Sequence, residues 1–501
     1  MPPSAGSVFP SVPASSPAAR RCAWGVIGLF AVLAWYAVPH GIGVSWRECD
    51  TQAIARNFLV DGFDPLRPRV DWRGDTDGAV ECEFPAYQLA IASVLAVVGP
   101  AAEWPGRLLA LLATVWAALA LHRLLELRVG PAGALAGLAT FLGAGGTILI
   151  ATRVMPDAWS LAFAIASLGV FVRYLTTGSG VSLALAVAAL ALAGAQKPLA
   201  LQLGMVMFGW TALLAPARLR EPRLWLAFAA VLGLVGAWLA HGKALYDETG
   251  LTFGVLADGD TKFPDAAHLL SPKIHAQLAW TSVQYGVSAV GGLALALLVL
   301  RRRFDRVDAV LLGTVAIGLY VSLRYSYHHR IGPHYHVFAA LLGAWCVARA
   351  WPARAGPLVW ALFGVAVVAQ GAWRFSFERE WRARVVATPQ MEVAASIRAL
   401  TRPGDLVVVR EPRPAVDPEW QRRTNYENPS LFYQSGRRGW VLPADGFDVA
   451  ALDDLLQRGA RLVVDQLPDD NVAEVDRWLD EHGDAVLDLH GARVHRLRSA
   501  P

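Results

Sequence analysis

The chain is a series of apolar stretches, many of them long enough to cross a lipid bilayer. Of its 501 residues, 55% are hydrophobic and 17% are charged, whereas soluble domains usually carry about 25% charge. A spanning helix needs about 20 mostly apolar residues. Candidate stretches lie at 23–41, 105–125, 132–151, 157–175, 181–195, 198–215, 223–240, 284–300, 307–323, 334–350 and 356–373. We therefore expect a mainly α-helical, polytopic membrane bundle with about 11 spans.

Basic residues between these stretches predict the orientation. With the N-terminus in the cytoplasm, every short inner loop carries arginine, as expected for cytoplasmic loops. The residues concerned are Arg123, Arg128, Arg173, Arg218, Arg220, Arg223, Arg301, Arg302, Arg303, Arg306, Arg349 and Arg354. We expect the N-terminus inside and the C-terminus outside a bacterial-type inner membrane. The formal net charge of +4 gives no reason to expect a nucleic-acid partner.

Three domains follow from this topology. Residues 1–22, rich in Pro, Ser and Ala, are expected to be a disordered cytoplasmic N-terminus. Residues 23–374 form the transmembrane domain; within it, 42–104 is a first external loop with interfacial helices, because the apolar run 84–98 is too short to span. Residues 375–501 alternate strand-like runs (406–410, 461–465, 486–490) with helical ones (391–400, 449–458, 472–482). They predict a small extracytoplasmic α/β domain.

The first external loop concentrates the acidic residues that could do chemistry. Glu48 and Asp50 follow the first span directly. Ionisable groups at a membrane boundary are candidates for function, and a carboxylate at a helix start is also favoured by the helix dipole. Asp50 is therefore either a reactive carboxylate or a helix N-cap. Cys49 and Cys82 lie in the same loop, as a disulfide or as two thiols.

Later outer-face segments add charged and imidazole side chains. Asp157 follows a proline and opens a span, which also suits a helix cap. Lys197 lies between two apolar helices, where it either binds a phosphate or extends to the interface. Arg330, His334 and His336 share one short loop. Contacts to an anionic headgroup or a sugar, interface anchoring and metal binding are the alternatives there.

These segments together resemble the first external loop and later outer-face segments of the GT-C glycosyltransferases, and most of all the branch of protein O-mannosyltransferases and lipid A aminoarabinose transferases. The resemblance rests on residues 47–58 (Arg-Glu-Cys-Asp-Thr-Gln-Ala-Ile-Ala-Arg-Asn-Phe) and 83–87 (Glu-Phe-Pro-Ala-Tyr). Met-Pro-Asp (155–157), Gln-Lys-Pro (196–198), His-Tyr-His (334–336) and Asn-Pro-Ser-Leu-Phe-Tyr-Gln-Ser-Gly-Arg-Arg-Gly-Trp (428–440) extend it along the chain. Arg47 departs from the family, which often has an acid at that position.

The resemblance implies an inverting transfer of a sugar from a polyprenyl-phosphate donor to a lipid, polysaccharide or protein acceptor on the extracytoplasmic face. A first-loop acid would be the general base, here Asp50 with Glu48 as its partner. The substrate-binding candidates are Arg56, Glu83, Tyr87, Asp157, Lys197, Arg330, His334 and His336. No cofactor is expected to be required and no metal ligands are assigned, although some family members use a divalent metal.

Two other functions remain open from the sequence alone. A polyprenyl-lipid or polysaccharide transporter is the main alternative, but transporters tend to have paired internal repeats with polar residues near the bilayer midplane. In this chain the ionisable residues gather at one face. A non-catalytic sensor, whose C-terminal domain binds a partner, is the second alternative.

Overall fold

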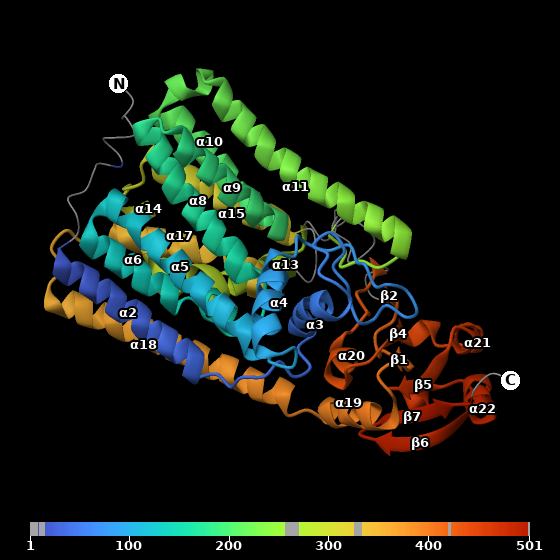
Figure 1. The fold of residues 1–501 in the computed structure, drawn as a ribbon. Coiled ribbons are helices and arrows are strands. Elements are labelled where there is room, and N and C mark those ends of the chain that lie inside the picture. Colours follow the sequence, from blue (N-terminus) through green and yellow to red (C-terminus); the bar gives the residue numbers. More distant parts are fainter. Residues whose placement is uncertain (1–8, 10–15, 256–269, 325–332, 419–421, 499–501) are drawn as a thin grey trace. The chain divides into compact units, whose positions relative to one another are not determined.

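A computed structural model describes residue 9 and residues 16–255, 270–324, 333–418 and 422–498 (Figure 1). The chain divides into two compact units. A helical unit comprises Met1–Pro39, Arg107–Trp238 and Lys262–Glu380, and a loop–sheet unit comprises His40–Gly106, Leu239–Thr261 and Trp381–Pro501. Three of the boundaries fall within α5 (Trp104–Val129), α11 (Pro222–Thr249) and α18 (Pro357–Val386). Residues 42–104, the predicted first external loop, thus belong to the same unit as the C-terminal domain, whereas the sequence-based division assigned them to the transmembrane domain.

The helical unit is built from apolar helices packed side by side. Its other elements are α2 (Pro17–Tyr36), α6 (Pro131–Gly143), α7 (Gly145–Thr152), α8 (Asp157–Thr177), α9 (Gly180–Gln196), η1 (Pro198–Leu201), α10 (Gln202–Leu214), η2 (Pro216–Arg220), α13 (Pro272–Thr281), η3 (Ser282–Val287), α14 (Ala289–Leu300), α15 (Arg306–Arg324), η4 (Pro333–His336) and α17 (Ala339–Ala350). Glycines let some of them approach closely. A Cβ at Gly291 on α14 would lie 2.6 Å from Gly343 Cα on α17, which is the small-residue packing common in membrane bundles.

Among the described residues, five helical segments are long and apolar enough to cross a membrane: α2, α5, α8, α11 and Pro357–Leu400. Two bent pairs raise the number to seven if each is one span, namely α6 with α7 at 60° and Pro272–Val287 with α14 at 102°. The first bend falls at Ala144, which is extended between glycines, and glycine weakens a helix. All eleven predicted stretches overlap helices. The count of about 11 spans and the orientation stay predictions.

The N-terminal segment differs from the expected disorder at its end. Helix α2 begins at Pro17, so residues 17–22 are helical. The Ser16 hydroxyl accepts a hydrogen bond from Ala19 N, and Pro17 occupies the first helical position. Both features favour a helix start. The rest of the expected disordered segment, apart from Phe9 and Ser16, lies outside the described residues.

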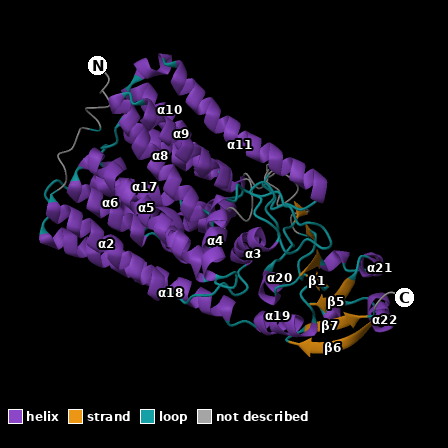
Figure 2. Cartoon of the chain, in the orientation of Figure 1, coloured by secondary structure: helices purple, strands orange, loops and turns teal. Residues whose placement is uncertain are grey.

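The loop–sheet unit holds all the strands of the described chain (Figure 2). Its helical elements are α3 (Trp46–Val60), α4 (Ala86–Val98), α19 (Pro389–Leu400), α20 (Ser430–Ser435), η5 (Ala444–Gly446), α21 (Val449–Gln457), η6 (Pro468–Asp470) and α22 (Ala473–His482). Its strands are β1 (Leu406–Arg410), β2 (Val416–Asp417), β3 (Arg422–Arg423), β4 (Arg438–Leu442), β5 (Ala460–Asp465), β6 (Gly483–Leu489) and β7 (Ala492–Leu497). The predicted strands and helices of the C-terminal domain are confirmed, and strands β2, β3, β4 and β7 and helix α20 are additional.

Five strands form one mixed sheet in the order β4-β1-β5-β7-β6. Strand β1 pairs in parallel with β4 and β5, and β7 pairs antiparallel with β5 and β6. Because side chains alternate across a strand, Val408 contributes to the core with α21 and α22, while Val407 and Val409 contribute to the opposite core. That second core also contains Ile54, Phe58, Val70, Trp72 and Val80 of the first external loop. The loop and the sheet therefore share one hydrophobic core.

Candidate active site

Helix α3 carries both candidate catalytic acids. It begins at Trp46 after Ser45, which has an extended backbone and occupies the N-cap position. Asp50 consequently lies in the second turn and does not cap the helix. The structure removes the N-cap alternative for Asp50 and leaves a buried carboxylate that needs another explanation.

Asp50 is buried against two tryptophans. Asp50 is 2% exposed, and Trp72 Nε1 donates a hydrogen bond to Asp50 Oδ1 over 2.9 Å. Burial raises the pKa of Asp50 to about 7, although the hydrogen bonds from Trp72 and Trp46 and the charge of Arg47 each oppose this rise. A carboxyl group that exchanges its proton near neutral pH is suited to acid–base chemistry.

Glu48 has a different environment, although it is only two residues away. It is 0% exposed, and Arg382 Nη2 donates to Glu48 Oε1 over 2.8 Å while Nη1 pairs with the other oxygen. Arg382 Nη1 also donates to Gly41 O over 2.8 Å. Both Glu48 oxygens are therefore engaged in a buried, bidentate ion pair, a geometry that fixes orientation.

Arg47 and Glu83 form a second ion pair beside Asp50. Arg47 Nη2 lies 2.7 and 2.8 Å from the two Glu83 oxygens, and its guanidinium lies over the Phe253 ring at 5.2 Å. Arg47 and Asp50 are three residues apart on α3 and so share a helix face. The residue that departs from the family pattern thus supplies positive charge next to the candidate base.

Two further predicted residues are held in the same unit. Arg56 Nη2 pairs with Asp71 Oδ2 at 2.5 Å, and its guanidinium lies 5.3 Å from the centre of the Tyr433 ring. Tyr87 is fully buried and its hydroxyl donates to Gly106 O. Asp50, Glu48, Arg56, Glu83 and Tyr87 therefore all lie in the loop–sheet unit.

The helical unit brings together another pair of predicted residues. Asp157 is the first residue of α8, and Lys197 follows the end of α9. Lys197 Nζ lies 3.7 Å from Asp157 Oδ1 and 5.4 Å from the centre of the Tyr335 ring. Both charged residues are at most 7% exposed. Lys197 is thus engaged with an acid and an aromatic ring instead of extending into solvent.

The histidine loop lies in the same unit. His336 is 0% exposed, and its Nδ1 shares a 2.9 Å hydrogen bond with Ser282 Oγ. The His334 ring lies 4.1 Å from the Tyr335 ring, centre to centre. Arg330 lies outside the described residues. Within the described part of the chain, no group of three or more His, Cys, Asp or Glu residues could hold a metal ion.

The two loop cysteines are separate, buried thiols. Cys49 Sγ donates to Gly43 O at 3.2 Å and Cys82 Sγ donates to Glu83 O at 3.3 Å. Burial raises the pKa of both thiols well above the usual value. Of the two alternatives from the sequence, the structure has two thiols and not a disulfide.

Sequence reasoning missed two residues that contact the candidate acids. Trp72 was visible only as an aromatic residue within an acidic run, Asp71-Trp72-Arg73, with no sign of its partner. Arg382 is separated from Glu48 by 334 residues, so spacing gave no signal for their pairing. One indication for Arg382 was available from the sequence: it is a basic residue in a polar segment shortly after the last predicted span.

Comparisons with known proteins find likeness in structure alone. No protein-family model matches the chain, and a search of curated proteins finds no match. The apo crystal structure of ArnT from Cupriavidus metallidurans is similar with a TM-score of 0.62 at 14% identity, covering 95% of this chain and 98% of that one. The structure of the same protein bound to undecaprenyl phosphate gives a TM-score of 0.61 at 13% identity, covering 94% and 97%.

Proposed function

We propose that this chain, which has the GT-C glycosyltransferase fold, is a multi-pass membrane enzyme that transfers a sugar from a polyprenyl-phosphate donor. The acceptor is a lipid, polysaccharide or protein of the cell envelope, and transfer occurs on the extracytoplasmic face with inversion at the anomeric carbon. One observation carries this proposal: Asp50 is a buried carboxylate that accepts a hydrogen bond from Trp72, on the helix that bears the family-like motif.

Asp50 is the general base in this proposal. An acceptor hydroxyl must lose its proton as it attacks the sugar, and a positioned carboxylate accelerates such a step by about 10²–10⁴-fold. The carboxylate of Asp50 is basic enough to take that proton near neutral pH because burial disfavours its charge. Glu48 is the less suitable base, since both of its oxygens already accept from Arg382.

The departing polyprenyl phosphate needs positive charge. In the loop–sheet unit, Arg56 supplies a guanidinium that is already paired with Asp71. Lys197, which lies beside Asp157 in the helical unit, stays a predicted phosphate ligand. Cationic groups that stabilise a developing anion contribute strongly in sites that exclude water. The ArnT structure with bound undecaprenyl phosphate supports a donor of this class. The substrate roles of Glu83, Tyr87, His334, His336 and Arg330, like the absence of a required cofactor, stay predictions.

The test is sugar transfer by the purified full-length protein in lipid nanodiscs. A labelled polyprenyl-phosphate sugar and an extract of cell-envelope acceptors are supplied, and labelled product is counted. We expect Asp50→Asn to lower the turnover number by at least about 10²-fold. Asp64→Asn changes an acid of the same loop whose side chain accepts a hydrogen bond from Leu66 N, and it should retain activity. Full activity in Asp50→Asn would refute the base assignment.

A further inference from the structure

Resting on the proposed role of Asp50, we infer that Trp72 is a positioning residue for the Asp50 carboxylate, and that the edge strand β4 of the C-terminal sheet holds Trp72 in place. The sheet would then take part in catalysis without touching the substrate. This role joins two parts of the chain that are far apart in sequence.

The free edge of β4 is closed by the external loop. Strand β4 is an outer strand of the sheet, with β1 on its other side. Gly439 on β4 donates from its N to Asp71 O at 3.2 Å, and Gly74 N donates to Gly439 O at 2.7 Å. Two backbone hydrogen bonds therefore join Asp71 and Gly74 to the edge of the sheet, where a strand has unpaired backbone groups. Trp72 lies between the two paired residues.

The loop approaches β4 closely enough to require glycine at position 74. A Cβ at Gly74 would lie 2.0 Å from Trp440 Nε1 of β4. Gly74 also has φ of +58°, a conformation that glycine adopts at low cost. This contact limits the distance between Gly74 and the strand.

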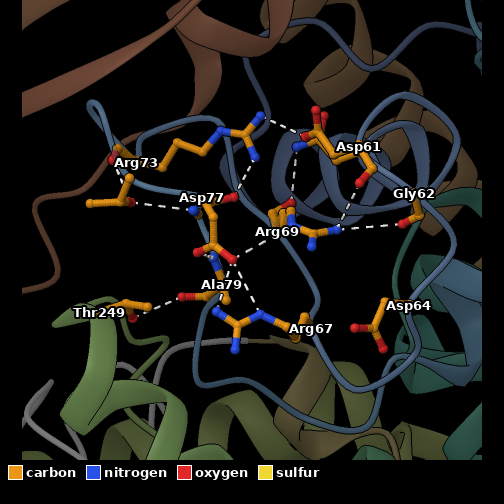
Figure 3. A network of polar contacts seen from close by, with 12 residues as sticks. Asp61, Gly62, Asp64, Arg67, Arg69, Arg73, Asp77, Ala79 and Thr249 are labelled. Carbon is orange, nitrogen blue, oxygen red and sulfur yellow. Dashed lines mark hydrogen bonds and ion pairs between the residues drawn. The ribbon is translucent and has the colours of Figure 1, made fainter.

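Ion pairs fix the same segment from its other end (Figure 3). Arg73, next to Trp72, is 3% exposed, and it pairs with Asp61 at 2.6 Å and donates to Asp77 O at 2.7 Å. Asp61 also pairs with Arg438 of β4 at 2.7 Å. Trp72 is thus flanked by anchored residues, and its indole has little freedom to leave Asp50.

The groups around Asp50 come from several elements. Trp72 and Trp46 donate to it, Arg47 on the same helix attracts its charge, and Asp71 repels it. The charge of Asp50 in turn contributes to the raised pKa of Cys82. The Phe253 ring lies 6.0 Å from the Trp72 ring, centre to centre, and under the guanidinium of Arg47. Trp72, Trp46 and Arg47 therefore favour the ionised carboxylate, and they oppose burial and Asp71, which disfavour it.

Loss of the indole N–H should have a specific effect. A hydrogen bond to a carboxylate stabilises the ionised form, so its removal raises the pKa of Asp50 above about 7. We expect an upward shift of about one pH unit, from the strength of hydrogen bonds to charged groups. A purely structural role of Trp72 would change protein yield or melting temperature without moving this pKa.

The experiment uses the full-length protein in nanodiscs and two readouts. The first is the pH profile of sugar transfer. The second needs no activity: the stretching band of the protonated carboxyl group is followed by infrared difference spectroscopy as pH changes, and the band absent in Asp50→Asn is assigned to Asp50. Trp72→Phe and Trp72→Leu both lack the donor but pack differently, so either one suffices if the other fails to fold.

Trp478→Phe is the matched control. Trp478 is also a buried tryptophan of the loop–sheet unit, and its Nε1 donates to the carboxylate of Asp453 at 2.6 Å, on the helices α22 and α21. This variant should leave both the Asp50 band and the transfer profile at the wild-type midpoint.

Four outcomes decide the inference. An upward shift in both readouts for the Trp72 variants, with a reduced turnover number and an unchanged KM for the donor, supports it. An unchanged infrared midpoint overturns it. An unchanged transfer profile in an active Trp72 variant also overturns it. An infrared shift in the Trp72 variants, when the wild-type protein transfers no sugar, supports the contact between Trp72 and Asp50 and shows that the proposed function itself has failed.

Discussion

Two carboxyl groups on one turn of α3 have different partners, one a charged group and the other an uncharged hydrogen-bond donor. Glu48 meets the guanidinium of Arg382, whereas Asp50 meets the indole of Trp72. The sequence identified both acids because they follow the first apolar stretch. It could not assign their roles, because the partner of Glu48 lies 334 residues away and the partner of Asp50 gave no motif.

The pH dependence of transfer follows from the environment of Asp50. A base must be ionised to accept a proton, and the pKa of Asp50 is about 7. We therefore expect the rate of transfer to rise with pH and to reach half of its maximum at about pH 7, measured at saturating donor. A rate that is constant between pH 5 and pH 9 would be incompatible with Asp50 as the base.

The Glu48–Arg382 pair should contribute to stability. Removing one partner of a buried ion pair leaves an uncompensated charge, which typically costs about 3–5 kcal/mol. We expect Glu48→Gln to lower the apparent melting temperature in detergent, and the double variant Glu48→Gln/Arg382→Gln to regain part of the loss. Asp50→Asn removes a charge that burial disfavours, so it should melt at or above the wild-type temperature. Equal melting of Glu48→Gln and wild type would show that the pair is dispensable.

At the scale of elements, strands and helices with regular apolar patterns could be predicted from the sequence, but the pairing at the edge of the sheet could not. The apolar run of β1, with Val407, Val408 and Val409, gave a strand with the observed bounds. Strand β4 contains Arg438 and Gly439 and did not show the alternation expected of a strand. Its outer pairing with residues 71–74 depends on glycines whose partners are distant in sequence, so no local signal could indicate it.

Gly74 provides a direct test of this contact with β4. A Cβ at this position would meet Trp440 Nε1, and such overpacking typically costs about 1–3 kcal/mol. We expect Gly74→Ala to lower the apparent melting temperature and to increase proteolytic cleavage between residues 62 and 79. Gly436→Ala is the control, because Gly436 also has a positive φ but nothing lies within 4 Å of a Cβ there. Similar cleavage in both variants would argue against the pairing.

For the whole molecule, composition predicted a helical membrane protein and the order of short motifs predicted the GT-C fold. The division into units could not be predicted from a linear sequence. The loop–sheet unit is assembled from three separated segments, and its core joins residues such as Phe58 and Trp72 to Val407 and Leu462. Because the first external loop completes its core with the C-terminal domain, neither segment is expected to fold alone.

Truncation after residue 386 should therefore expose the loop. Cys82 is 2% exposed and belongs to the shared core, so its thiol should resist maleimide labelling in the full chain. We expect the truncated protein to be labelled at Cys82 and to lose transfer activity, whereas Cys346, buried in the helical unit, should stay protected. Continued protection of Cys82 would show that the loop folds without the sheet.

The sidedness of the acid-bearing loop is the claim on which the proposed chemistry most depends. It can be measured by labelling spheroplasts with a membrane-impermeant maleimide, using the native thiol of Cys22, which is exposed, and Leu66→Cys, at a loop position that is 55% exposed. We predict that Leu66→Cys is labelled in intact spheroplasts and that Cys22 is labelled only after permeabilisation. Labelling of Leu66→Cys only after permeabilisation would put Asp50 in the cytoplasm and contradict an outer-face transferase.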